Sequence, residues 1–193
     1  MATTVEEIEL EKSSSSQVRD TFDLLFNGRI AVLYPLMISS AVNIAMLSSV
    51  FVKMMVDSMG DDSGWSDQEM ISKALLCMLG LGTGEIIGSL AFGRITDKYS
   101  FKTTIAINAV AVAVAYTILI VYSAIYDFSF VLGTLMTFFW GVQDSGRYCF
   151  LNSVLGFQFE SKTTPFSVFK FLQSMLIFVF TVVESLLSTQ QAY

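Results

Sequence analysis

Residues 74–102, ALLCMLGLGTGEIIGSLAFGRITDKYSFK, contain the features that decide the fold. The part from Ala74 to Gly93 is mostly apolar, and the cations Arg94, Lys98 and Lys102 follow it. An α-helix rises about 1.5 Å per residue and the hydrocarbon core of a bilayer is about 30 Å thick, so about 20 apolar residues cross it. The stretch therefore predicts a membrane-spanning helix that ends in a charged loop at the membrane surface.

The composition of the whole chain agrees with a membrane location. Of the 193 residues, 53% are hydrophobic and only 15% are charged, whereas soluble domains carry roughly 25% charged residues. The absence of histidine excludes His-containing zinc sites and Ser-His-Asp catalysis. Because the sequence also lacks a nucleotide-binding loop or a metal-ligand cluster, we expect no enzyme, no cofactor, no metal and no catalytic residue. The net charge of -6 argues against nucleic acid as a partner.

Further apolar stretches of spanning length predict an all-α integral membrane protein with about five transmembrane helices. The fourth stretch is doubtful as a simple span, because Gln143, Asp144 and Arg147 interrupt its second half. The predicted transmembrane bundle covers residues 29–190, with helices at about 30–56, 74–93, 103–126, 128–155 and 165–187.

The distribution of lysine and arginine predicts how the chain is oriented. Positively charged loops stay on the inner face of a membrane, and nine of the 11 cations fall on one side of the predicted helices. We therefore expect the N-terminus inside and the C-terminus outside, in a membrane that the sequence does not identify; a mitochondrial inner membrane assembly and an endomembrane are both options. The nine are Lys12, Arg19, Arg29, Arg94, Lys98, Lys102, Arg147, Lys162 and Lys170.

Residues 1–28 form a polar, acidic tail before the first predicted span. Four glutamates and a run of serines between Glu6 and Ser16 cannot build an apolar core. Between Gln17 and Phe26 apolar residues recur at helical spacing, which fits either a short interfacial helix or a solvated linker.

The second predicted span carries glycines at intervals of four residues, Gly80, Gly84 and Gly88. Residues four apart lie on one face of a helix, and a row of small residues lets another helix approach to backbone contact. The row predicts close helix packing.

The residues that follow this glycine row resemble the signature loop of the major facilitator superfamily, G-x-x-x-D-[RK]-x-G-x-[RK]. Gly93, Asp97, Lys98 and Lys102 match the pattern, and Ser100 replaces its second glycine. The resemblance implies a transporter-like helical bundle. In such a bundle Asp97 would interact with the N-terminus of a helix in the opposite half of the transporter.

Later stretches narrow this resemblance to the uncoordinated-ninety-three-like (ion channel regulatory protein-like) branch. Residues 140–145 are similar to its G-x-G-D-A element, and residues 165–174 are similar to its A-F-x-x-F-K-x-x-Q-S helix start. The branch has an asparagine where this chain has Tyr148. The resemblance covers about Arg29 to Gln190 and implies helices seven to eleven of a twelve-helix transporter, a partial bundle of the C-terminal half only.

Four polar residues at predicted membrane depth are candidate functional residues. An unpaired charge at the depth of Glu85 costs at least ~2.5 kcal/mol, so Glu85 is either a coupling-proton site or, more commonly, a hydrogen-bonding group to a neighbouring helix. Asn43 is more often an interhelical contact than a substrate contact. Asp144 and Arg147 are three residues apart and favour a local ion pair over a gate.

These features leave two classes of function. The first is a non-catalytic structural or accessory subunit of a larger membrane protein complex, with other membrane subunits as partners beside the lipid bilayer. The alternative is a half-size transporter that works as a homo- or hetero-dimer with a second copy or a related chain, with proton coupling as one option. We favour the accessory subunit, because polar groups inside a membrane need burial and the chain cannot bury all of them by itself.

Overall fold

The computed structural model describes residues 19–60, 64–159 and 163–191. All regular structure in these ranges is helical, as the sequence predicts. Residues 19–25, which include part of the predicted interfacial helix or linker, are helical. The elements that follow are α2 (Gly28–Ala31), α3 (Tyr34–Ala45), the π-helix η1 (Met46–Phe51), α4 (Val52–Asp57), α5 (Asp67–Cys77), α6 (Leu79–Lys98), α7 (Phe101–Ile125), α8 (Phe130–Gln158) and α9 (Thr164–Gln191).

The first long helix is continuous from Tyr34 through η1 to Asp57. It begins later than the predicted Ile30, because Pro35 stands in its first turn, a position that suits a residue without a backbone N–H. The sequence did not predict the π-helical turn at its centre. There the hydroxyls of Ser48 and Ser49 both donate to the carbonyl oxygen of Ala45, at 3.1 and 2.7 Å.

The second long helix extends beyond the predicted 74–93 at both ends. It begins at Asp67, because Ser66 and Glu69 form a capping box in which the backbone N–H of Ser66 donates to Glu69 Oε2 at 2.9 Å. It continues past Gly93 to Lys98. The predicted inner loop from Gly93 to Lys102 is therefore mostly helix, and only Tyr99 and Ser100 separate α6 from α7.

Four helices of the described residues are long and apolar enough to cross a membrane: Tyr34–Asp57, Asp67–Lys98, Lys102–Ile125 and Thr164–Leu186. α8 forms near the predicted fourth stretch but is not among them. Its polar residues Gln143, Asp144 and Arg147 lower its hydropathy, and all three are buried.

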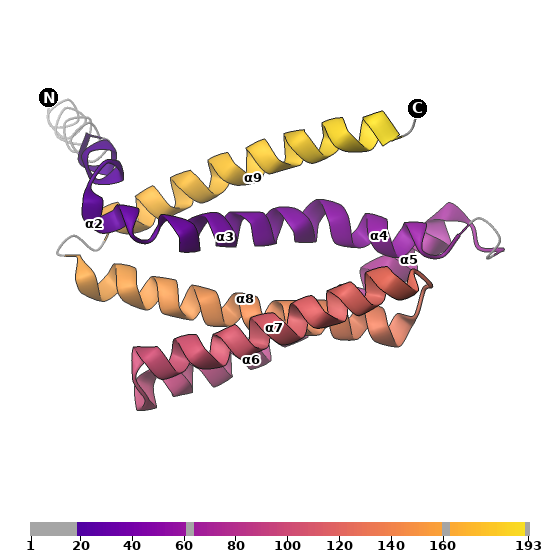
Figure 1. The fold of residues 1–193 in the computed structure, drawn as a ribbon, viewed down its shortest axis with the longest axis horizontal. Coiled ribbons are helices and arrows are strands. Elements are labelled where there is room, and N and C mark those ends of the chain that lie inside the picture. Colours follow the sequence, from indigo (N-terminus) through magenta and orange to yellow (C-terminus); the bar gives the residue numbers. More distant parts are fainter. Residues whose placement is uncertain (1–18, 61–63, 160–162, 192–193) are drawn as a thin grey trace, which may run out of the picture.

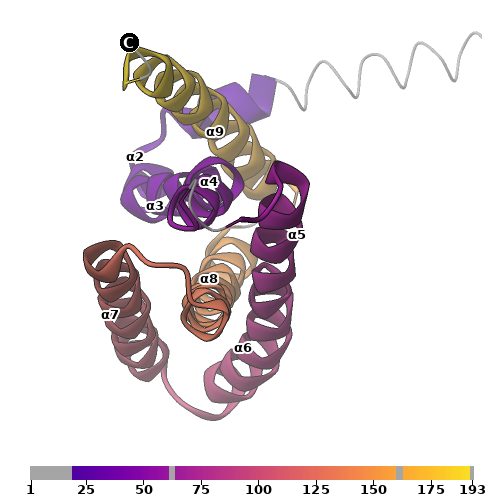
Figure 2. The same cartoon turned by 90° about the vertical axis from the view of Figure 1, so that its right-hand side faces the viewer.

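Helix α8 lies at the centre of the arrangement. The end-on view in Figure 2 shows it between α6 and α7, with α3, α4 and α9 on the remaining side. In Figure 1, α9 approaches the start of α3 and then diverges from α8 toward its C-terminal end. The polar middle of α8 is thus enclosed by the more apolar helices around it.

Two apolar clusters flank the polar middle of α8. One contains Trp140 and Met136 together with Phe51 of η1, and the ring centroids of Phe51 and Trp140 are 4.7 Å apart. The other contains Leu151 and Leu155 together with residues of α3 and α9. The residues between Trp140 and Leu151 include four buried polar groups, Gln143, Asp144, Ser145 and Arg147.

Candidate functional site

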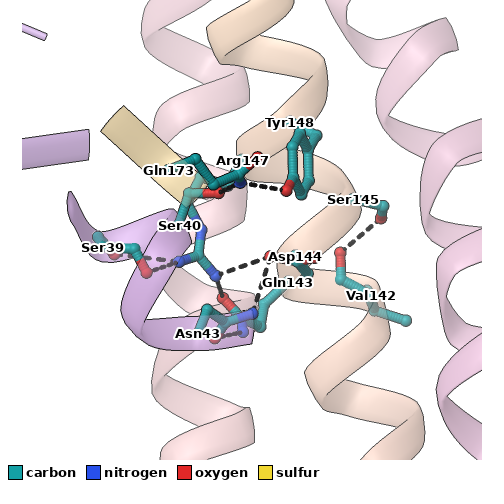
Figure 3. Close-up of polar contacts among 10 residues, drawn as sticks. All are labelled: Ser39, Ser40, Asn43, Val142, Gln143, Asp144, Ser145, Arg147, Tyr148 and Gln173. Carbon is teal, nitrogen blue, oxygen red and sulfur yellow. Dashed lines mark hydrogen bonds and ion pairs between the residues drawn. The ribbon is translucent and has the colours of Figure 1, made fainter. Parts of the chain in front are cut away.

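Asn43 of α3 joins two polar residues of α8. Its amide nitrogen donates to Asp144 Oδ1 at 2.8 Å, and its amide oxygen accepts from Gln143 Nε2, also at 2.8 Å. Asn43 is 4% exposed, so both ends of the amide are satisfied away from water. Figure 3 shows the three side chains converging between the helices. The position of Asn43 is that of an interhelical hydrogen-bonding group.

Arg147 completes this part of the network. Its Nη2 lies 3.3 Å from Asp144 Oδ1, so the ion pair expected from their spacing is present. Nη2 also donates to Gln143 Oε1 at 2.6 Å, and Nη1 donates to the carbonyl oxygen and hydroxyl of Ser39 at 2.7 and 3.0 Å. The guanidinium therefore bridges α8 to α3, and its positive charge balances the carboxylate of Asp144.

The network continues to α9 through Gln173. Its amide nitrogen donates to Ser40 Oγ at 2.9 Å and to the hydroxyl of Tyr148 at 2.5 Å. Lys170 Nζ donates to its amide oxygen at 3.0 Å. We did not assign Gln173 or Tyr148 to the site from the sequence. The available signal was spacing, since Asp144 and Tyr148 lie four residues apart and share a helix face.

The glycine row of α6 is covered by the chain's own helix α8. Gly80, Gly84 and Gly88 are buried, and a Cβ atom on Gly84 would collide with the carbonyl oxygen of Phe138. Gly141 of α8 has the reciprocal contact with the carbonyl oxygen of Leu81. The two backbones touch, so this row is an internal packing surface of the chain.

Glu85 points into an open hollow between α6 and α8. The hollow has a volume of ≈ 320 Å³ and is lined by Glu85, Ser89, Asp144, Ser145 and Tyr148. Glu85 is exposed, and within the described ranges its carboxylate makes no hydrogen bond or ion pair. The structure thus brings Glu85 and Asp144, candidates from two predicted spans, to one hollow. Asp144 is balanced by Arg147, whereas Glu85 is not.

The residues of the signature-like loop lie apart from this hollow. Asp97 and Lys98 occupy the last turn of α6 and are exposed, and Lys102 lies in the first turn of α7. Gly93 lies inside α6 with open space around its Cα, because a Cβ atom there would meet nothing within 4 Å. No hydrogen bond or ion pair of Asp97 is present in the part of the chain that the structure describes.

The chemistry available at the site is that of charge and hydrogen bonding. Among the described residues, no three His, Cys, Asp or Glu side chains are grouped to hold a metal ion. A carboxylate at membrane depth either takes up a proton or pairs with a cation. The hollow beside Glu85 is open, so either a proton or a cation can reach its carboxylate. Comparison with models of protein families, with curated proteins and with solved structures finds no match for this chain.

Proposed function

We propose that the chain is a non-catalytic accessory subunit of a larger membrane protein complex. The observation that carries this proposal is the exposed carboxylate of Glu85 near the middle of the helix Asp67–Lys98. An ionised side chain facing lipid at that depth costs at least ~2.5 kcal/mol. The network around Asp144 is satisfied within the chain, whereas Glu85 is a charged group with no polar partner among the described residues. A partner subunit that covers the hollow would supply that neighbour.

The proposal includes α8 as a fifth membrane crossing and the bundle as part of one half of a major-facilitator-like fold. The position of α8 among the four more apolar helices supports it, since a polar helix crosses a bilayer when its neighbours shield it from lipid. An inside N-terminus and an outside C-terminus follow from the positively charged loops.

A half-size transporter is the second candidate, because two carboxylates from different helices line the same hollow. In that role Glu85 would bind and release the coupling proton, and a second chain would form the opposite wall of the substrate cavity.

The mass of the native assembly separates the two candidates. We expect the tagged full chain, solubilised from its own membrane, to migrate in a large multisubunit complex on blue-native gels. The purified chain in liposomes should show no proton-linked uptake when a panel of small solutes is offered. A symmetric homodimer with proton-linked uptake, lost in Glu85→Gln but kept in the matched control Glu184→Gln on α9, would overturn the accessory role.

A further inference from the structure

Helix α6 has a second row of small residues, on a different side from the glycines that face α8. Gly82, Ser89 and Gly93 lie within about 40° of one another around the helix axis at 100° per residue. A Cβ atom on Gly82 or Gly93 would meet nothing within 4 Å, and Ser89 is exposed. Ile86, which is 64% exposed, lies between Gly82 and Ser89 on the same side. A partner helix would therefore pack on a surface of small residues and one isoleucine that is exposed in the described structure.

Of the two carboxylates that line the hollow beside this row, only that of Asp144 has an ion-pair partner among the described residues. Asp144 pairs with Arg147, which leaves the carboxylate of Glu85. Lys170 of α9 lies beside the Tyr148 wall, with its Nζ 5.4 Å from the centre of the Tyr148 ring. Its ammonium donates to Gln173 and forms no ion pair with Glu85. The charge that complements the hollow is therefore a single positive one.

We propose that this face of α6, with the Glu85 hollow at its edge, binds a transmembrane helix of a partner protein that carries a lysine or arginine at the depth of Glu85. This inference rests on the accessory role proposed above and names the chemistry of the partner. The small residues and the exposed Ile86 give the partner helix an uncovered packing surface. The ammonium or guanidinium group enters the hollow, pairs with Glu85, and meets the hydroxyl of Ser89 and the ring of Tyr148.

A second copy of the chain does not supply such a group. Among the described residues, Arg147 is the cation near the middle of a long helix, and it is 5% exposed and held by Ser39, Gln143 and Asp144. Lys53, Lys73 and Lys170 lie toward the ends of their helices. The partner is thus a different protein.

The test uses the full chain, donor-labelled and reconstituted in phosphatidylcholine liposomes, with acceptor-labelled synthetic helices of about 20 leucine and alanine residues. One peptide carries a lysine at its centre and its matched control carries leucine there. We expect energy transfer to report about tenfold tighter association of the lysine peptide. The preference should vanish in Glu85→Gln and persist in Glu184→Gln.

Charge exchange distinguishes pairing from a general disturbance of the fold. In Glu85→Lys, a peptide with a central glutamate should bind better than the lysine peptide. Equal binding of the lysine and leucine peptides to the unmodified chain, binding of neither, or a lysine preference that survives Glu85→Gln would each overturn the inference. Self-association of the labelled chain that displaces the lysine peptide would also overturn it, in favour of a dimer.

The fate of the native complex separates this inference from the accessory role. If a large complex forms in the native membrane and is unchanged by Glu85→Gln, the accessory role stands and the Glu85 pairing is wrong. If no large complex forms but the lysine preference holds in liposomes, the pairing stands and the accessory role is wrong.

Discussion

Among single residues, Arg147 has the largest expected effect on stability. Interhelical hydrogen bonds in membranes average about 0.6 kcal/mol, whereas removing one partner of a buried ion pair costs about 3–5 kcal/mol because the other charge is left unpaired. Arg147→Leu leaves the buried carboxylate of Asp144 without its cation. We therefore expect this substitution to lower the free energy of unfolding in detergent by about 3–5 kcal/mol. Arg94→Gln, at an exposed arginine of α6, is the control. A loss below about 1 kcal/mol in Arg147→Leu would contradict this account of the network.

Alanine substitutions at Gly82 and Gly84 of α6 allow the effect of packing on stability to be measured separately from the effect of helix propensity. A Cβ atom on Gly84 collides with the carbonyl oxygen of Phe138, whereas one on Gly82 meets nothing within 4 Å. Gly84→Ala should destabilise the chain by about 1–3 kcal/mol through overpacking. Gly82→Ala should leave stability unchanged or raise it by up to about 1 kcal/mol. Thermal unfolding of the two variants side by side tests this, and a larger loss in Gly82→Ala would refute the assignment of the two helix faces.

At the scale of the elements, the sequence predicted each long helix but not all of its limits. Apolar length located the spans, since it needs only local composition. The start of α5 was missed because Ser66 and Glu69 are polar, and their capping bonds extend the helix into the predicted loop. Asn43 and Glu85 were recognisable as polar groups at membrane depth. In the structure Asn43 is buried and Glu85 is exposed. This difference depends on which helices pack together, and the spacing of residues along one helix does not determine the packing.

The π-helical turn η1 predicts an unusual tolerance to deletion. A π-helix holds an extra residue in its turn, so deleting Ser49 should convert the turn to α-helix while Asn43 and Met55 keep their facing. We expect a loss below about 1 kcal/mol, since the interhelical bonds of Asn43 remain. Deleting Val142 from the regular helix α8 should rotate Gln143 and Asp144 by about 100° relative to the preceding turns and unfold the network. Scanning fluorimetry measures the stability of the two deletion variants. Equal losses of stability would contradict the presence of an extra residue in the turn of η1.

At the scale of the whole molecule, the order of the helices explains why α8, which is not among the four described helices long and apolar enough to cross a membrane, contains the most buried residues. α8 carries Asp144 and Arg147, and α3, α6, α7 and α9 surround it (Figure 2). These four helices expose many large apolar side chains. Within the described residues the polar groups around Asp144 are satisfied, whereas the carboxylate of Glu85 makes no hydrogen bond or ion pair. Two buried atoms elsewhere, Asn108 Oδ1 and Trp140 Nε1, also lack a hydrogen-bond partner. At the hollow of Glu85, water, a proton or another protein must therefore complete the bundle.

The same arrangement predicts the course of the chain across the membrane. If α8 is a true crossing, the connections at its two ends lie on opposite sides. The α7–α8 connection, which contains Asp127, lies at one end of the bundle, and the α6–α7 connection, which contains Tyr99, lies at the other end with the end of α8 and the start of α9 (Figure 1). Thr163 directly precedes α9. All three residues are exposed, so single cysteines there, in a chain with Cys77→Ala and Cys149→Ala, can be reached by a membrane-impermeant maleimide. In sealed, right-side-out vesicles we expect labelling at position 127 only, with positions 99 and 163 labelled after the vesicles are opened, because cations flank the latter two positions and stay inside. Labelling of 127 and 163 from one side would mean that α8 lies within the bundle without crossing the bilayer.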